Sequence, residues 1–281
     1  MYVAPHRSTG GFKLGVDETR LWYEATTMSL ERPHFDAPPL VEAVFDCFVE
    51  PSGDLSDLRA FEASFFARFP DYQEATRQEW QRFETKVEFK DGKAIGQSLD
   101  AQQIGVRRWN ADKNRGVLIG PSVMALNVVP PYGRFEDHAP HLRELAEAFI
   151  SLARPKRIEW LGHRYINQVQ LNLAEQQSPA RLFTLYPAIP EHRAMTHPPV
   201  TVQLEAARFQ EGVVLTTLNL SARTPDKAIY SLDVYARTVG EVAASASSIA
   251  GWHSLAHGAI MDAFLGSVSA EARKRFKERS S

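Results

Sequence analysis

Several features that often indicate a function are scarce or absent in this sequence. Its 281 residues include a single cysteine, Cys47, which excludes an intrachain disulfide framework and any zinc site built from several cysteines. No stretch approaches the roughly 20 consecutive apolar residues of a membrane helix, and residues 1–30 lack the apolar stretch of a signal peptide. We therefore expect a cytoplasmic protein with no membrane-spanning segment.

The common catalytic and phosphate-binding motifs are also missing. The patterns G-x-x-x-x-G-K-[ST], G-x-G-x-x-G, G-x-S-x-G and H-E-x-x-H do not occur, so the sequence implies no cofactor. Charge of one sign is not in excess either, because 32 Lys and Arg stand against 34 Asp and Glu, for a net charge of −2. Such a chain has no global field that attracts nucleic acid, which makes nucleic acid an unlikely partner.

The first half of the chain alternates apolar and polar residues in the way typical of strands. Residues 40–50 place Phe45, Cys47 and Val49 on one strand face, and we expect Cys47 to be a buried, inert thiol there. An amphipathic helix over about 55–69 follows. Four strand-like segments and a helix complete this half: 79–89, 96–101, 104–110, 117–129 and the helix 137–153.

The second half repeats this order of elements. It contains a strand at 158–173, a short helix at 179–186, strands at 200–209, 213–222 and 228–238, and a long helix at about 240–265. Ser269 then fits the N-cap of a last short helix.

This order predicts an α+β protein of two similar modules, each a curved antiparallel sheet packed on a long helix. The modules would span residues 38–154 and 155–281, after an N-terminal arm of residues 1–37. The repeated order indicates an internal duplication, although sequence identity between the halves is negligible.

His253 and His257 form the sharpest local pattern, because residues four apart on a helix share one face. Two imidazoles at this spacing can bind a transition metal, with Asp262 or Glu241 as a third ligand. The alternative is that both histidines flank the apolar core and bind no metal.

Arg164 marks a second pattern, in a strand that carries Gln168 and Gln170 on the same side. Such a side could line a polar cleft that recognises an anionic group, or it could be an ordinary solvated or inter-module surface. Asp233 lies between Leu232 and Val234, so its carboxylate would need a cationic partner such as Arg164. A structural ion pair and a catalytic carboxylate are both consistent with this position.

Several segments resemble a sporadically distributed family of uncharacterised prokaryotic proteins of similar length. The resemblance is carried, in order, by Pro38-Pro39-Leu40-Val41-Glu42, by Gly162-His163-Arg164-Tyr165-Ile166-Asn167, and by His257, Ile260 and Phe264. His163 departs from the leucine usual in that family. The resemblance implies a prokaryotic, cytoplasmic protein, and it marks Glu42, Arg164, Tyr165, Asn167 and His257 as motif positions and candidate ligand or partner contacts.

Two hypotheses of function follow. The first is a non-catalytic protein-binding or assembly component with a protein partner or a second copy of itself, consistent with the missing catalytic motifs and with aromatic residues in the predicted loops. The second is an enzyme or small-ligand-binding protein with an inter-module cleft, in which Arg164 holds an anion and Asp233 and His257 are the catalytic candidates. The second requires His257 to lie within about 10 Å of Arg164.

Overall fold

The computed structural model describes residues 33–52, 57–90, 93–173, 178–188 and 200–279. Most of the predicted N-terminal arm, residues 1–32, therefore lies outside the described residues. The part that is described contains β1 (His34–Phe35), which pairs with β11 (Glu278–Arg279) near the other end of the chain.

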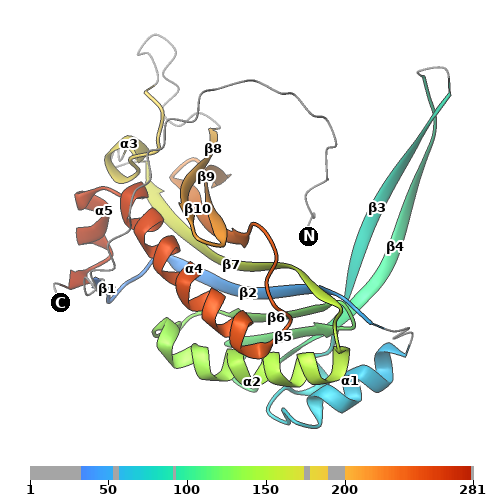
Figure 1. Ribbon diagram of the computed structural model, residues 1–281. Coiled ribbons are helices and arrows are strands. Elements are labelled where there is room, and N and C mark those ends of the chain that lie inside the picture. Colours follow the sequence, from blue (N-terminus) through green and yellow to red (C-terminus); the bar gives the residue numbers. More distant parts are fainter. Residues whose placement is uncertain (1–32, 53–56, 91–92, 174–177, 189–199, 280–281) are drawn as a thin grey trace.

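A nine-stranded antiparallel sheet dominates the molecule (Figure 1), and the α+β prediction is confirmed. The strands lie in the order β3-β4-β5-β6-β2-β7-β10-β9-β8. Their bounds are β2 Leu40–Glu50, β3 Gln78–Lys90, β4 Lys93–Trp109, β5 Arg115–Gly120, β6 Val123–Val128, β7 Arg157–Asn172, β8 Thr201–Phe209, β9 Gly212–Arg223 and β10 Lys227–Thr238.

Two strands from different halves of the chain meet in the middle of this sheet. β2 pairs with β7 from Leu40↔Asn167 to Glu50↔Arg157, while β2 also pairs with β6, and β7 with β10. The two expected sheets are thus one continuous sheet that crosses the proposed boundary near residue 155. The duplication itself stays a prediction.

Five α-helices occur among the described residues: α1 Leu58–Phe66, α2 Phe135–Ala153, α3 Pro179–Leu182, α4 Ala246–Ser267 and α5 Ala270–Arg275. Serine hydroxyls cap two of them, because Ser245 accepts the N–H of Ser248 and Ser269 accepts that of Ala272. The Ser269 cap confirms the prediction. None of the helices in the described ranges is long and apolar enough to cross a membrane.

The helices lie on one face of the sheet, which we call the covered face. Every helix contributes buried residues to a single hydrophobic cluster with this face, including Phe65, Phe149, Leu182, Trp252 and Ala272. We call the other face the open face, because its smaller apolar cluster consists of sheet residues alone. Cys47 is fully buried on the covered face, as predicted.

The hairpin of β3 and β4 extends away from the rest of the molecule (Figure 1). β5 pairs only with Val106–Trp109 of β4, so the remainder of β4 pairs with β3 alone. The sequence segments at 79–89, 96–101 and 104–110 are thus two long strands. The predicted strand at 117–129 is also corrected, since it divides at Pro121 and Ser122 into β5 and β6.

We expect Phe45→Ala to lower the free energy of unfolding by about 3–5 kcal/mol, because it leaves a cavity at a fully buried site. The Phe45 ring lies 4.6 Å from the His163 ring and 5.9 Å from that of Phe135. Urea denaturation measures the loss. The control Leu255→Ala removes a side chain that is 55% exposed, and it should change stability by less than about 0.5 kcal/mol. If the two variants lost the same free energy of unfolding, the placement of Phe45 in the core would be contradicted.

Candidate functional site

The alternation of β7 distributes the predicted site residues over both faces of the sheet. Tyr165 and Asn167 are buried on the covered face, and the Tyr165 hydroxyl meets Nδ1 of His257 on α4 at 2.8 Å. Arg164 points the other way, because successive residues of a strand face opposite sides. The sheet therefore separates Arg164 from His257, and the two do not share a cleft.

A histidine–tyrosine cluster lies between the covered face and the helices, formed by Tyr132, His163, Tyr165, His253 and His257. The hydroxyl oxygens of Tyr132 and Tyr165 are 2.8 Å apart, which extends the contact with His257 into a chain of three polar groups. Nδ1 of His163 donates to the carbonyl oxygen of His253 at 3.1 Å. This bond holds the proton of neutral His163 on Nδ1.

Burial shifts the pKa values of several groups of this cluster. It lowers the pKa of His163 well below its usual value, with further lowering from His253 and His257, and it lowers the pKa of His253 to about 3. Burial also raises the pKa of Tyr165 well above its usual range. Within the described ranges, Nε2 of His163 and both ring nitrogens of His253 have no hydrogen-bond partner. Both rings pack against the ring of Phe45 and against each other.

The spacing of His253 and His257 puts both rings near His163, at 5.5 Å and 6.1 Å between ring centroids. No group of three or more His, Cys, Asp or Glu within the described residues is arranged to hold a metal ion. The third ligands considered, Glu241 and Asp262, are exposed, whereas His253 is fully buried.

The open face has a polar centre of paired charges and amides. Nε of Arg164 donates to Oδ1 of Asp233 at 2.8 Å, and a terminal nitrogen of Arg164 also meets Oδ2. Nδ2 of Asn127 donates to Oε1 of Glu42 at 2.7 Å. The expected ion pair between Arg164 and Asp233 is therefore present, and it occupies the guanidinium edge that an anionic ligand would need.

Asp46 is the most strongly perturbed carboxyl group of this polar centre. It is 4% exposed, and desolvation raises its pKa to about 7 against the opposing effects of Arg164 and the backbone N–H of Gly162. A Cβ at position 162 would overlap the Asp46 carboxylate, so glycine is required opposite it. Asp46 was not among the predicted site residues, because strand alternation alone does not reveal what lies across the sheet.

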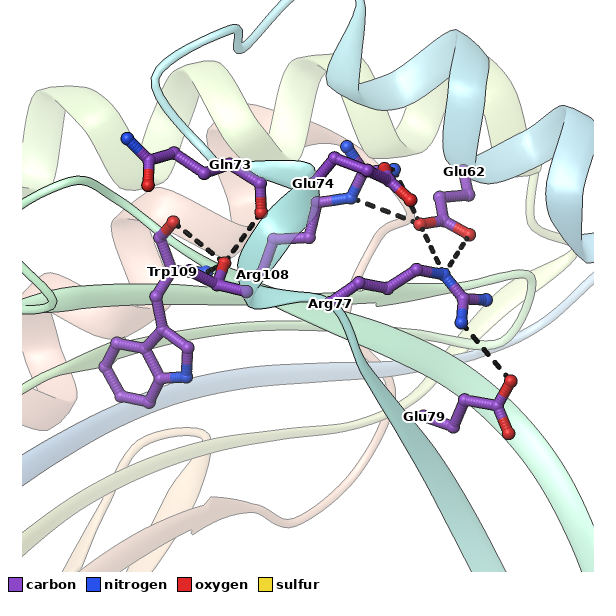
Figure 2. A network of polar contacts seen from close by, with 8 residues as sticks. Glu62, Gln73, Glu74, Arg77, Glu79, Arg108 and Trp109 are labelled. Atoms are coloured by element: carbon purple, nitrogen blue, oxygen red, sulfur yellow. Dashed lines mark hydrogen bonds and ion pairs between the residues drawn. The ribbon is translucent and has the colours of Figure 1, made fainter.

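A buried carboxylate anchors the base of the β3–β4 hairpin (Figure 2). Glu62 of α1 accepts hydrogen bonds from Nε of Arg77 at 3.0 Å and from a terminal nitrogen of Arg108 at 2.7 Å. Arg77 also pairs with Glu79, and Arg108 with Glu74. The network ties α1 to the entry of β3 and to the end of β4.

A second set of contacts at this base fixes the turn before β3. The hydroxyl of Thr76, in the short 3₁₀ helix Glu74–Thr76, accepts the N–H of Trp109 at 2.8 Å and lies 2.7 Å from the carbonyl oxygen of Gln73. The Arg107 guanidinium stacks over the rings of Trp80 and Trp109, at 4.8 Å and 5.2 Å. The hairpin therefore leaves the sheet from a braced base.

The sequence carried one signal for this network. Glu62 lies four residues after Leu58 and three before Phe65, on the apolar stripe of the helix, and a carboxylate on such a stripe requires a cationic partner. Its partners Arg77 and Arg108 are 15 and 46 residues away, so no local pattern identifies them.

A comparison with models of protein families and with curated proteins finds no match to this chain.

Stability should fall more steeply toward acid because of His253. Its folded pKa lies below its unfolded value, so between pH 7.5 and 5.5 the unfolded chain takes up the proton and gains about 1.4 kcal/mol from this one group. His163 acts in the same sense, and Asp46, with its raised pKa, acts in the opposite sense.

We expect His253→Leu to reduce the change in the free energy of unfolding over this range by about that amount, as measured by urea denaturation at both pH values. His163 and Asp46 are common to both proteins and cancel in the comparison. The control His34→Gln alters an exposed residue and should leave the pH dependence unchanged. An unaltered pH dependence in His253→Leu would contradict the burial of a neutral imidazole.

Glu62→Gln should lower the free energy of unfolding by about 1–3 kcal/mol, because two arginines lose their common carboxylate. Glu79→Gln is the matched control: it breaks a pair whose acidic side chain is 52% exposed, and it should cost less than about 1 kcal/mol. Chemical denaturation measures the free energy of unfolding of both variants. A loss in Glu79→Gln as large as that in Glu62→Gln would refute the anchoring role.

Proposed function

We propose that this protein is a non-catalytic binding or assembly component, and that the β3–β4 hairpin is its contact element. The observation that carries the proposal is that most of the hairpin pairs with no other strand of the sheet while its base is held by Glu62, Arg77 and Arg108. A two-stranded ribbon is marginally stable in water by itself. A partner that covers it would supply the missing stabilisation.

The braced base supports this role. Ordering a contact element on binding costs conformational entropy, and an element that is already fixed avoids much of that cost. Arg108 and Glu62 are both largely buried, at 12% and 5% side-chain exposure, so the brace is not a solvated surface pair. An ordinary surface loop needs no such anchor.

The alternative of an enzyme that uses Arg164, Asp233 and His257 has less support. His257 shares the covered face with Tyr165, while Arg164 and Asp233 pair on the open face. A group that transfers a proton must lie within hydrogen-bond reach of the bound substrate, and the sheet separates His257 from the guanidinium that would hold that substrate.

We also infer that the two halves descend from one duplicated unit, as the order of elements suggested. In support, β2 and β7 each pair with the last strand of their own half, and that strand pairs with the one before it: β6 with β5, and β10 with β9. The long helix α2 follows the strands of the first half, and the long helix α4 follows those of the second half. We further propose that the chain belongs to the prokaryotic family that its segments resemble, and that it is a cytoplasmic protein.

A shortened hairpin tests the proposed function. Residues 83–101 are replaced by Asn-Gly, a turn that suits a two-residue hairpin loop, so that Arg82 and Gln102, which pair across the strands, flank the new turn. The variant should retain the urea midpoint of the parent within about 10%, since the core lies elsewhere.

We expect the parent protein, purified from its native host, to form a stoichiometric complex or a self-assembly in multi-angle light scattering, and the shortened variant to be a free monomer. A shortened variant that keeps the same complex would overturn the proposal. A parent that is a free monomer in the native extract would overturn it as well.

A further inference from the structure

We propose that the partner of the hairpin is a second copy of this chain, joined by antiparallel pairing of the two β3 strands about a two-fold axis at Thr85. This inference rests on the proposed function in taking the hairpin as the contact element. It adds the identity of the partner, the strand that makes the contact and the register of the pairing.

The first argument is that β3 has a free and regular edge. Among the residues that the structure describes, it is the end strand of the nine-stranded sheet and pairs only with β4. The register shifts by one extra residue at two places, between Trp80 and Gln81 and between Glu88 and Phe89, and both extra residues belong to β4. β3 contains no proline. Bulges, prolines and charged side chains all hinder edge pairing. β3 has no bulge or proline of its own, and its charges favour or oppose pairing according to the charges that face them.

The second argument is charge complementarity of β3 with itself. Arg82, Glu84, Lys86, Glu88 and Lys90 occupy every second position of the strand, with alternating sign. Antiparallel pairing about Thr85 puts Glu84 opposite Lys86 and Arg82 opposite Glu88, each pair occurring twice, over an overlap from position 80 to position 90. Opposite charges at directly paired positions stabilise a sheet.

The same pattern disfavours neighbouring registers. Moving the two-fold axis by one residue, to Lys86, sets Lys86 against Lys86 and Glu84 against Glu88. Like charges at paired positions are destabilising. An axis at Val87 again pairs opposite charges, Lys86 with Glu88 and Glu84 with Lys90, but its overlap runs only from position 84 to position 90, so the longer overlap favours the axis at Thr85.

Charge reversal on the full-length protein tests the pairing. Lys86→Glu sets Glu84 against an acidic residue twice and should raise the dimer dissociation constant roughly tenfold or more. The double variant Glu84→Lys/Lys86→Glu restores both pairs and should dimerise like the parent. The double variant Lys86→Glu/Glu88→Lys has the same composition and should dimerise more weakly than the first double variant. About Thr85 it keeps Glu84 against an acid and sets Arg82 against a lysine, and only the shorter overlap about Val87 pairs opposite charges.

Sedimentation velocity at low salt is the readout, and circular dichroism shows that the variants fold. In β4, positions 84, 86 and 88 face Asp100, Ser98 and Gly96, so none of these changes places like charges opposite each other within the hairpin. A 1:1 mixture of Lys86→Glu with Glu84→Lys should form a heterodimer although each variant alone is monomeric.

Three results would overturn the inference: a monomeric parent, no difference between the two double variants, or dimerisation of the second one only. A monomeric parent whose complex with a different protein is lost when the hairpin is shortened would refute the second copy and leave the proposed function standing. A dimer that survives shortening would refute both.

Discussion

The antiparallel ladder between β2 and β7 is the interaction on which the rest of the structure depends. It joins residues more than 100 positions apart in the chain, such as Phe45 and His163, and both strands are buried on the covered face. Because each of these strands also pairs with the last strand of its own half, the ladder turns two sets of strands into one sheet. α2 and α4 then pack side by side on the same face (Figure 1). The hairpin projects because β5, its only neighbour in the sheet, is six residues long.

The same ladder decides which polar groups can act together. Alternation along β7 assigns His163 and Tyr165 to the covered face, where burial lowers the pKa of His163, and it assigns Arg164 to the open face beside Asp233. Asp46 comes to lie across from Gly162, where the absence of a side chain leaves room for its carboxylate. Side chains that are neighbours in the sequence between residues 162 and 167 therefore lie on opposite faces of the sheet. Some are in the buried core under the helices, and others are among the paired charges of the open face.

The strands and helices themselves were largely predictable from the sequence, because they follow from local periodicity. The strand at 40–50, the buried Cys47, the strand near 158–173 and the Ser269 cap all correspond to the structure. The full length of β4 was not predicted, since the expected strands at 96–101 and 104–110 left out positions 93–95 and the two glutamines Gln102 and Gln103. Gly105, inside β4, is a site of close approach, where a Cβ would lie 2.6 Å from the carbonyl oxygen of Ile119. Strand order and the Glu62 network join distant residues, and although Glu62 on an apolar stripe indicates a cationic partner, no local pattern identifies Arg77 and Arg108 as the partners.

Native-state hydrogen exchange of the backbone amides tests the central claim most directly. If the β2–β7 ladder makes one cooperative unit, the slowest amides of β2, β6, β7 and β10 exchange only by global unfolding, with the same free energy and the same dependence on denaturant. A contradictory result is two groups of amides, β2 with β6 and β7 with β10, that open at separate free energies. That outcome would show two independent modules that merely touch, and the single sheet would no longer explain how the polar groups are divided between its faces.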